Sequence, residues 1–384
     1  MPMRTIDTLG DVEGKRALVR VDFNVPISDG EVGDDARMRR ALPTLMELRD
    51  RGAKLVLVSH LGRPKDREPE FSLAPVAERA SKLLKEDVAL AEDLDNVPDA
   101  DVVMLENIRY EPGETENDPE LAKRLASLGD VFVNDAFGTA HRKHASTYGV
   151  VEHVDKAAAG LLFQTEVDTI RLIMNKADRP FLAIMGGAKV TEKVHVIGKF
   201  LELADKVLLG GAMATPFFKV LGHDISDSLC EDDGLELAEE LLERDGYPGG
   251  KIQLPVDLVV ADQMDEKAEV QIIQGVDVPE GFMQLDIGSK TRTEYVAEIR
   301  KAQTIFWNGP IGAFEHKPFA AGSLAIAQAM AQTEATTVVG GGDSGAALAE
   351  FGLAHSVTHL STGGGASLKL IEGTPLPGLD ALRS

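Results

Sequence analysis

Basic side chains recur in the first half of the sequence, just after short apolar runs end. The runs at 55–58, 102–105 and 131–133 lead into four of them, which are His60, Arg63, Arg109 and Arg142. A guanidinium group can hold a carboxylate or a phosphate through two parallel hydrogen bonds. If these side chains converge in the fold, they predict a site for a small anion. Scattered surface arginines are the alternative for any single one.

In the second half of the sequence, the apolar runs are followed by glycines instead of basic side chains. Five apolar runs lead into glycine, at residues 186–187, 210–211, 309, 340–342 and 363–365. Glycine lets the backbone come close to a bound group, and a following helix offers free N–H groups to phosphate oxygens. Lys189 and Lys193 follow the first of these turns. We therefore expect a nucleotide site here, although a structural turn explains any one glycine equally well.

A rival motif lies at residues 340–345, which formally match the GxGxxG fingerprint of dinucleotide-binding dehydrogenases. That fingerprint also needs an acidic residue about 20 positions further on. The next apolar run ends instead in Ser361-Thr362-Gly363. The sequence has no GxxxxGK[ST] pattern, no CxxC spacing, and no catalytic signature around Cys230. Walker-type ATPases are therefore excluded, and a dehydrogenase is poorly supported.

The elements that would position these residues alternate between strand and helix. Apolar runs typical of strands lie at 17–21, 55–58, 102–105, 131–133, 181–185, 207–209, 305–307 and 337–339. Helix-period stretches lie at 35–51, 73–85, 191–203 and 291–301, and Thr291 with Glu294 predicts a capping box. This alternation predicts parallel sheets covered by helices on both faces, with ligands beyond the carboxyl ends of the strands. Alternation continuing from Val19 would put Arg20, Asp22 and Asn24 on one face.

One helical stretch lies near the middle of the chain, at 163–176, between two groups of strands. Its apolar residues Phe163, Val167, Ile170 and Ile173 fall on one side. We interpret it as the connector between two α/β domains, since 384 residues are long for one core. Another crossover helix within a single domain is the alternative.

Composition narrows the class of protein. The hydrophobic share of 43% and the charged share of 27% are those of ordinary globular proteins. A net charge of −23 argues against nucleic acid or an anionic membrane as the partner. No apolar run is long enough to span a bilayer, and the first residues include Asp7, Asp11 and Glu13 rather than a signal segment. With Cys230 as its single cysteine, the chain is expected in a reducing cytoplasm.

Taken in order, these motifs resemble one family, phosphoglycerate kinase, over nearly the whole chain. The matching strings are Arg20-Val21-Asp22-Phe23-Asn24-Val25-Pro26, Ser59-His60-Leu61-Gly62-Arg63-Pro64, Glu106-Asn107-Ile108-Arg109, Asn134-Asp135-Ala136-Phe137, Ala140-His141-Arg142, Gly186-Gly187-Ala188-Lys189-Val190, Trp307-Asn308-Gly309-Pro310, residues 340–344 and residues 361–368. One departure is Lys369, which stands where the family usually carries Glu.

The resemblance implies an α/β fold with two doubly wound, Rossmann-like parallel-sheet domains, a central helix and an active-site cleft between the domains. The implied boundaries are 1–162 for a 3-phosphoglycerate-binding domain, 163–178 for the interdomain helix, 179–366 for a nucleotide-binding domain and 367–384 for a segment that returns to the first domain. The implied activity is reversible, Mg²⁺-dependent phosphoryl transfer between 1,3-bisphosphoglycerate and ADP, giving 3-phosphoglycerate and ATP. A monomer that closes around a hinge is expected. The non-enzyme alternative is a degenerate homologue that serves as a binding or scaffold protein.

The resemblance also implies roles for individual residues. Asp22 and Asn24 would hold the glycerate, and Arg37 would reach the transferring phosphoryl group. The rest of the substrate set would be His60, Arg63, Arg109 and Arg142. Arg37, Lys189 and Lys193 would act in catalysis, and Asp343 would hold magnesium. The nucleotide set would be Gly186, Gly187, Lys189, Lys193, Gly210, Gly211, Leu285, Asn308, Pro310, Glu315, Gly341, Gly342, Asp343 and Ser344. Family members are also thought to pair a Glu and a His, here Glu166 and His359.

Overall fold

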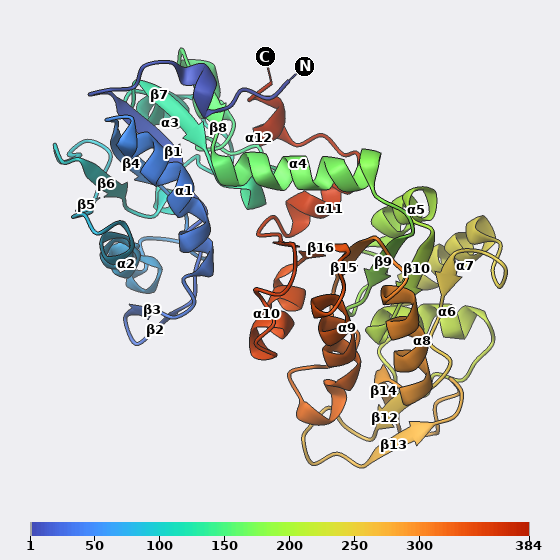
Figure 1. Ribbon diagram of the computed structural model, residues 1–384. Coiled ribbons are helices and arrows are strands. Elements are labelled where there is room, and N and C mark those ends of the chain that lie inside the picture. The colour runs from blue at the N-terminus through green and yellow to red at the C-terminus, as the bar shows by residue number, and fades with distance from the viewer. Residues whose placement is uncertain (1, 384) are drawn as a thin grey trace. The chain divides into compact units, whose positions relative to one another are not determined.

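The computed structural model describes residues 2–383, and the chain divides into two compact units (Figure 1). Unit 1 comprises Met1–Asp168 and Gly373–Ser384, and unit 2 comprises Thr169–Glu372. The boundary falls inside helix α4 (Leu161–Lys176), which is the helix expected in the middle of the chain. Each unit has its own parallel sheet.

The sheet of unit 1 has six parallel strands in the order β5-β6-β4-β1-β7-β8. These are β1 (Arg16–Arg20), β4 (Lys54–Val58), β5 (Ala89–Ala91), β6 (Val102–Leu105), β7 (Val131–Asn134) and β8 (Ala157–Ala159). Val19, Leu55, Val102 and Val133 are fully buried in one core cluster, as parallel strands covered on both faces require. Strand order reverses between β1 and β7, so the loops after these two strands flank the usual ligand position of such sheets.

Three longer helices and a small hairpin complete most of unit 1. They are α1 (Ala36–Asp50), α2 (Ala74–Leu84), α3 (Pro119–Ala126) and the hairpin of β2 (Ile27–Ser28) with β3 (Glu31–Val32). Helix α1 buries Met38, Ala41, Leu45 and Leu48, a three- to four-residue spacing that keeps one face against the sheet. Helix α3 starts where the Asp118 carboxylate accepts a 2.8 Å hydrogen bond from the Leu121 N–H and a proline follows.

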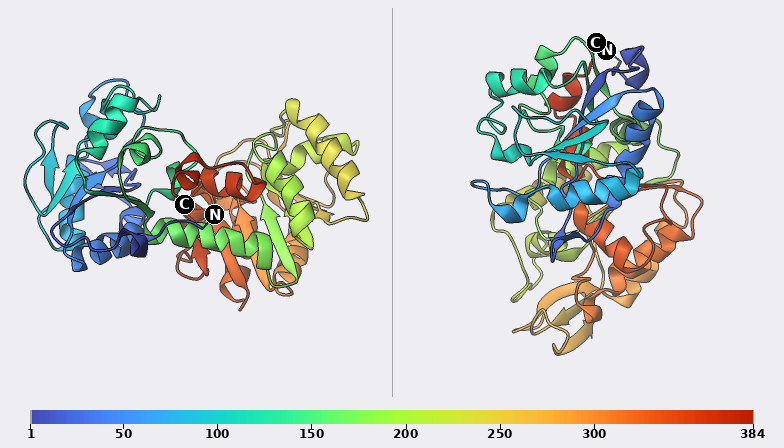
Figure 2. Two further views of the ribbon diagram at one scale, coloured as in Figure 1. Left: turned by 90° about the horizontal axis from the view of Figure 1, so that it is seen from above. Right: turned by 90° about the vertical axis from the view of Figure 1, so that its left-hand side faces the viewer.

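The two ends of the chain lie side by side in unit 1 (Figure 2). Met3 forms an isolated bridge with Arg383, and the Arg4 side chain donates a 2.6 Å hydrogen bond to the carbonyl oxygen of Ala381. The short helix α12 (Pro377–Asp380) contacts the segment that follows β7, since the Gly378 N–H donates to the Ala140 carbonyl at 2.9 Å. The last residues are therefore part of the core of unit 1.

Unit 2 contains a second parallel sheet, in the order β11-β10-β9-β15-β16-β17. Its strands are β9 (Phe181–Met185), β10 (Lys206–Leu209), β11 (Ile252–Gln253), β15 (Thr304–Asn308), β16 (Thr336–Gly340) and β17 (His359–Leu360). Counted along the unit, this is the doubly wound order 3-2-1-4-5-6, with the reversal between β9 and β15. The expected fold class, two doubly wound α/β domains with parallel sheets, is confirmed.

The remaining elements of unit 2 are helical, apart from a three-stranded antiparallel sheet. The helices are α5 (Val194–Leu203), α6 (Thr215–Val220), α7 (Asp233–Asp245), α8 (Ser289–Ile299), α9 (Ala321–Ala331), α10 (Gly342–Glu350) and α11 (Gly365–Glu372). The small sheet has the order β13 (Val270–Ile273), β12 (Leu258–Ala261), β14 (Met283–Ile287). Single 3₁₀ turns lie at Ile6–Leu9, Pro69–Phe71, Ile108–Tyr110, Phe137–Thr139, Gly149–His153, Gly211–Ala214 and Lys317–Phe319.

The capping box expected at Thr291 is wrong. Helix α8 begins two residues earlier, at Ser289, so Thr291 lies inside the helix. Its hydroxyl group and its backbone N–H both donate to the Asp257 carboxylate, at 2.5 and 2.7 Å, and the Lys290 N–H donates there at 2.9 Å. A carboxylate that precedes β12 therefore satisfies the free N–H groups of this helix, a contact that local spacing does not reveal.

Candidate active site

The acidic and amide groups after β1 form the first part of the site in unit 1. The strand itself ends at Arg20. The expected alternation continues beyond it, since Val21 and Phe23 are buried whereas Asp22 and Asn24 are half-buried, but Arg20 departs from it because it is fully buried. The Asp22 carboxylate accepts a 3.2 Å hydrogen bond from Arg37, which lies in the first turn of α1. Its other oxygen, Oδ1, is buried and has no hydrogen-bond partner among the described residues. A buried acceptor of this kind fits a ligand that brings a hydroxyl donor.

The loop after β4 is held from two sides. The Asn24 side chain accepts a 3.0 Å hydrogen bond from the Gly62 N–H, and Arg109 donates to the Gly62 carbonyl. Gly62 has a φ of +59°, and a Cβ there would lie 2.3 Å from the Phe71 ring. Only glycine fits this position, so the sequence Gly62-Arg63 fixes the course of the loop that carries Arg63.

A pocket of about 490 Å³ opens beside this loop. Its lining residues are Arg63, Pro64, Arg109, Thr115, Arg142 and His144. Burial, followed by the charges of Arg142 and Arg20, lowers the pKa of Arg109 to about 10, so the guanidinium stays charged at neutral pH. Its Nε is buried without a partner among residues 2–383. Crowded guanidinium groups with an unused donor create a site for an anion.

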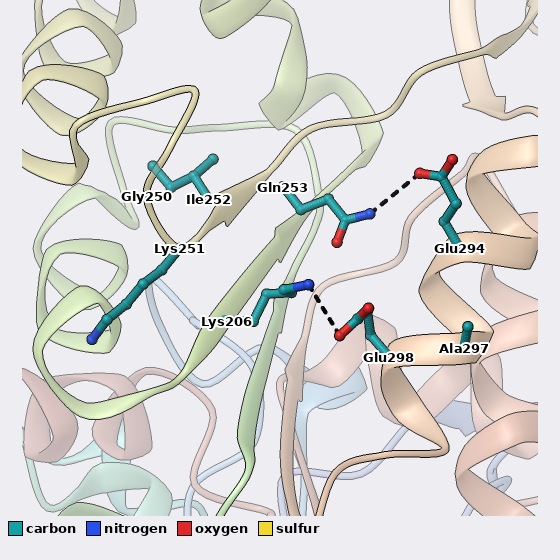
Figure 3. Close-up of a pocket in the computed structure, with 8 residues that line it drawn as sticks. All are labelled: Lys206, Gly250, Lys251, Ile252, Gln253, Glu294, Ala297 and Glu298. Carbon is teal, nitrogen blue, oxygen red and sulfur yellow. Dashed lines mark hydrogen bonds and ion pairs between the residues drawn. The ribbon is translucent and has the colours of Figure 1, made fainter.

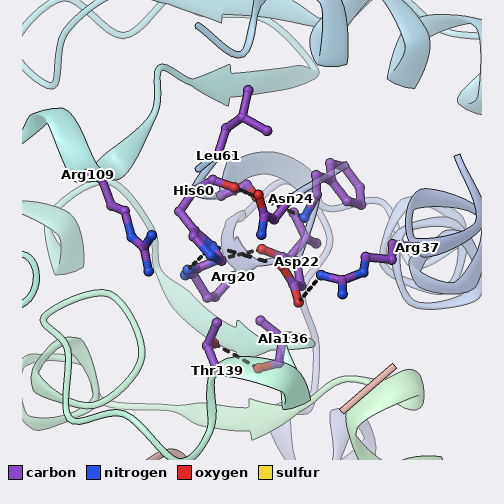
Figure 4. A network of polar contacts seen from close by, with 12 residues as sticks. Arg20, Asp22, Asn24, Arg37, His60, Leu61, Arg109, Ala136 and Thr139 are labelled. Atoms are coloured by element: carbon purple, nitrogen blue, oxygen red, sulfur yellow. Dashed lines mark hydrogen bonds and ion pairs between the residues drawn. The ribbon is translucent and has the colours of Figure 1, made fainter. Parts of the chain in front are cut away.

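Two histidines of this region, His60 and His144, are neutral. Burial, with smaller contributions from nearby arginines, lowers the pKa of His144 to about 4. The same causes lower the pKa of His60 well below its ordinary value. The positive charge of the site is therefore carried by arginine and is constant across the physiological pH range. His60 and Asp22 come close together with Arg37 and the fully buried Arg20 (Figure 4).

Sequence reasoning placed His60, Arg63, Arg109 and Arg142 in one site, and the structure brings all four to the same end of the sheet. It missed Thr115 and His144, which line the pocket. His144 stands only two residues after Arg142, in a basic stretch that follows β7, and this proximity was a usable signal. Thr115 lies in an irregular segment and gave no signal.

In unit 2, three glycine turns that follow neighbouring strands pack backbone against backbone. The Gly187 N–H donates to the Pro310 carbonyl at 2.8 Å, and the Gly187 carbonyl accepts from Met213 N–H at 2.8 Å. A Cβ at Gly186 would lie 2.2 Å from the Pro310 oxygen, and one at Gly211 would lie 3.0 Å from the Gly187 oxygen. A Cβ at Gly210 would lie 2.8 Å from the side chain of Ile311. These glycines are therefore required for the three turns to meet at the switch between β9 and β15.

Two lysines lie near the first glycine turn. The Lys193 ammonium group donates a 2.7 Å hydrogen bond to the Gly186 carbonyl, and burial lowers its pKa to about 8 against the opposing charges of Asp343 and Glu192. Helix α5 begins at Val194, so the start expected at residue 191 is wrong and Lys193 lies in the turn before the helix. Lys189 is exposed and pairs with Glu192 at 3.2 Å.

The N-terminus of α10 adjoins the third turn. Gly341 precedes the helix with a φ of +94°, and the Ser344 hydroxyl accepts a 2.6 Å hydrogen bond from the Gly309 N–H. The Asn308 amide donates to the Gly340 carbonyl at 2.9 Å. Asp343 is exposed in the first helical turn, beside Gly342. Backbone N–H groups at this end can bind phosphate oxygens, and an exposed carboxylate beside them can bind a cation.

The remaining predicted nucleotide residues lie on the loop after β15 and on β14. Leu285 is buried in a small apolar cluster with Phe319, and its carbonyl oxygen accepts a 2.9 Å hydrogen bond from the Ala313 N–H. Pro310 is half-buried and Glu315 is exposed, both on that loop. Pro310 and the Glu315 carboxylate therefore lie on a segment that continues directly from Asn308, next to the β14 strand that carries Leu285.

Magnesium was expected at Asp343 alone. Within the described part of the chain, no group of three or more His, Cys, Asp or Glu side chains could hold a metal ion. A single exposed carboxylate fits Mg²⁺, which keeps several waters and is usually bound by one or two carboxylates together with substrate phosphates.

A second pocket, of about 430 Å³, lies at the opposite end of β10 from its glycine turn (Figure 3). Lys206 pairs with Glu298 at 3.0 Å, and the Gln253 amide donates to Glu294 at 3.4 Å. The Lys251 ammonium group donates to the Leu201 carbonyl at 2.7 Å. Its polar side chains are thus occupied with one another or with backbone, and we assign this pocket no ligand. None of the helices in residues 2–383 is long and apolar enough to cross a membrane.

Comparison with known proteins gives a consistent result. The family model described as phosphoglycerate kinase matches residues 6–374. A phosphoglycerate kinase of Clostridium novyi (strain NT) is 46% identical over 391 aligned residues, covering 99% of this chain and 98% of that relative. The solved structure of phosphoglycerate kinase from Coxiella burnetii superposes with a TM-score of 0.89 at 40% identity, covering 99% of each chain. The solved structure of phosphoglycerate kinase from Pyrococcus horikoshii OT3 superposes with a TM-score of 0.86 at 32% identity, covering 99% of this chain and 98% of that chain.

Proposed function

The chain belongs to the phosphoglycerate kinase family, and from this premise we propose how its residues divide the work of the reaction. The enzyme is a phosphotransferase with a carboxyl group as acceptor. It transfers a phosphoryl group between 1,3-bisphosphoglycerate and ADP, giving 3-phosphoglycerate and ATP, as a step of glycolysis. The scaffold alternative is not favoured.

Unit 1 is proposed to bind 3-phosphoglycerate. The carboxylate and the phosphate that is not transferred would meet His60, Arg63, Arg109 and Arg142, where guanidinium groups crowd one pocket. The substrate hydroxyl would donate to the unpartnered Asp22 Oδ1. Asn24 would act mainly by holding the Gly62 loop. The observation that carries this proposal is the combination of unbalanced arginine charge with an unpartnered buried acceptor at the same site.

Unit 2 is proposed to bind the nucleotide. The turns at Gly186, Gly187, Gly210 and Gly211, the Asn308 amide and the backbone of residues 341–344 would surround the phosphates. Glu315 would accept from the ribose hydroxyls, and Leu285 with Pro310 would contact the base and sugar. These roles fit the switch position between β9 and β15, where doubly wound sheets bind their ligands.

Transfer itself needs positioning and neutralisation of negative charge rather than covalent chemistry. Arg37, Lys189 and Lys193 would stabilise the phosphoryl group as it moves, and no general base is needed because the acceptor is a carboxylate. Asp343 would hold Mg²⁺, which would supply charge neutralisation between the nucleotide phosphates. The phosphoryl donor and its acceptor must come together for transfer, which is why we expect the two domains to close. This closure stays a prediction. A monomer in the cytoplasm is likewise proposed, on the acidic composition and the single cysteine.

A coupled assay tests this function. Purified protein with 3-phosphoglycerate and Mg-ATP should turn over, and a chelator should stop the reaction while added Mg²⁺ restores it. Turnover that is unaffected by chelation would remove the magnesium proposal alone. No turnover at any salt concentration would instead favour the scaffold alternative.

A further inference from the structure

Arg20, at the end of β1, is a guanidinium group buried to 1% exposure behind the pocket of unit 1. Its Nε donates a 2.9 Å hydrogen bond to the Ser146 hydroxyl. That hydroxyl donates to the Glu114 carboxylate at 2.6 Å, and the Ser146 N–H donates to the other carboxylate oxygen at 2.9 Å. Glu114 is itself buried, at 2% exposure. A buried carboxylate therefore fixes the orientation of the guanidinium through Ser146 and offsets its charge.

The other two nitrogens of the Arg20 guanidinium group also have hydrogen-bond partners. Nη1 donates to the Val21 carbonyl and, at 3.5 Å, to the Val58 carbonyl. Nη2 lies 3.2 Å from Nδ1 of the His60 ring (Figure 4). Because guanidinium nitrogens only donate, the His60 Nδ1 must accept. A ring that accepts at Nδ1 and is neutral carries its proton on Nε2.

The alternative partner for Nδ1 is Asp22, whose Oδ1 lies 3.9 Å away. That separation is too long for a hydrogen bond, whereas 3.2 Å is within range. If Nδ1 carried a proton, it would face the Nη2 donor of Arg20 with no acceptor between them. Among the described residues, Arg20 is the one hydrogen-bond partner of the His60 ring. Asp22 Oδ1 is thus left for the ligand.

We propose that Arg20 is a positioning residue that locks His60 in the neutral Nε2–H tautomer, so that His60 presents a fixed hydrogen-bond donor to the anionic substrate. This inference rests on the proposed substrate-binding role of His60. It explains why a cation is buried behind the pocket instead of lining it. A neutral histidine donor binds oxygen atoms of the substrate independently of pH, while the arginines supply the charge.

The charged groups around the His60 ring also favour its neutral form. Arg20, Arg109 and Arg142, together with His144, disfavour a second proton on His60, and burial is the largest cause of its lowered pKa. Among residues 2–383, Asp22 is the one carboxylate that lies within 4 Å of a nitrogen of the ring, at 3.9 Å. Removing the charge of Arg20 should therefore raise the pKa of His60, while burial and the remaining arginines still hold it below its ordinary value.

The direct test is the tautomer of His60 in the ligand-free protein. Long-range proton–nitrogen NMR spectra of ¹⁵N-histidine-labelled protein distinguish the two neutral tautomers from the imidazolium. The chain has nine histidines, and the signals missing from a His60→Gln variant assign the ring. We expect the Nε2–H tautomer at about pH 7. The Nδ1–H tautomer, an imidazolium or an exchanging mixture would overturn the proposal. This readout needs neither substrate nor turnover, so it can fail while the proposed function stands.

A kinetic test separates positioning from support of the fold. Arg20→Met should raise the KM for 3-phosphoglycerate about tenfold, with a smaller change in kcat. Arg16→Met, on the same strand but paired with exposed Asp99, is the matched control and should leave KM unchanged. A KM for 3-phosphoglycerate that stays at the wild-type value in Arg20→Met would contradict the proposal. If Arg20→Met does not fold, the NMR spectrum of the wild-type protein still tests the proposed tautomer of His60.

Discussion

The Lys193 ammonium group donates a 2.7 Å hydrogen bond to the Gly186 carbonyl and thereby lies at the first glycine turn of unit 2. Gly309 adjoins the same nitrogen, since a Cβ there would lie 2.7 Å from it. The ammonium group is therefore placed between the turns after β9 and β15, and the nearby Asp343 favours its charged form. In this position a single cation can follow a phosphoryl group during transfer.

Lys193→Ala should lower kcat about a hundredfold or more while the KM for Mg-ATP changes less than about threefold, because the charge acts mainly on the transition state. Steady-state kinetics measures both parameters. Lys199→Ala is the matched control, since Lys199 lies on α5 and pairs with the exposed Glu202. A kcat within about twofold of wild type would show that the role of Lys193 is misassigned.

The pH dependence should also report Lys193. Burial lowers its pKa to about 8, so the free enzyme loses this charge as pH rises through about 8. We expect kcat/KM for Mg-ATP to fall across that range, since this parameter follows ionisations of the free enzyme. Lys193→Arg stays charged and should give a flat profile there, whatever its absolute rate. The same fall in both proteins would assign the ionisation to another group.

Arg142→Ala should raise the KM for 3-phosphoglycerate about tenfold or more, because it removes one guanidinium from the pocket that would hold the anion. The KM for Mg-ATP should stay within about twofold. Arg124→Ala serves as control, since Arg124 pairs with the exposed Asp95 at 3.0 Å away from this pocket. Equal effects on the two substrates would argue against a binding role confined to unit 1.

Asp135 gives a prediction on stability. Its carboxylate is fully buried, accepts a 3.1 Å hydrogen bond from the Phe163 N–H at the start of α4, and has its pKa raised by burial to about 7. A pKa raised on folding means that the protonated form stabilises the fold at low pH, and that this contribution is lost as pH rises through about 7. Relative to wild type, Asp135→Asn should therefore gain about 1.4 kcal/mol per pH unit between about pH 5 and 7.

Urea unfolding at a series of pH values measures this difference. Asp155→Asn, an exposed aspartate in the same unit, is the control and should show a constant offset. If the free-energy difference for Asp135→Asn is also constant across this range, the buried carboxyl group does not titrate there.

The strands and the chemistry at their ends were largely predictable from the sequence. Runs such as 181–185 are apolar throughout, as strands buried on both faces must be, and β9 has these same bounds. In a parallel sheet the ends of the strands share one edge, so Arg109 and Arg142 could be placed together without knowing the loops. The glycines at 186–187 and 210–211 were informative because close backbone packing tolerates no side chain.

Contacts between distant segments were not predictable. Asp257 caps α8 from another part of the chain, and nothing near Thr291 in the sequence indicates it. Arg20 was expected on one face with Asp22 and Asn24, but nothing in the sequence indicated that its side chain is buried against Ser146, 126 residues away. Whether an arginine lines a pocket or supports it from behind depends on such long-range partners, which local pattern and charge do not reveal.

The central claim is that the protein transfers the γ-phosphoryl group of ATP to the carboxylate of 3-phosphoglycerate. The product would be an acyl phosphate, which hydroxylamine traps as a stable hydroxamate. Purified protein with 3-phosphoglycerate, Mg-ATP and hydroxylamine should form hydroxamate and ADP in equal amounts, and omission of 3-phosphoglycerate should abolish both. Release of ADP without hydroxamate, or no reaction under conditions where the protein is folded, would contradict the account.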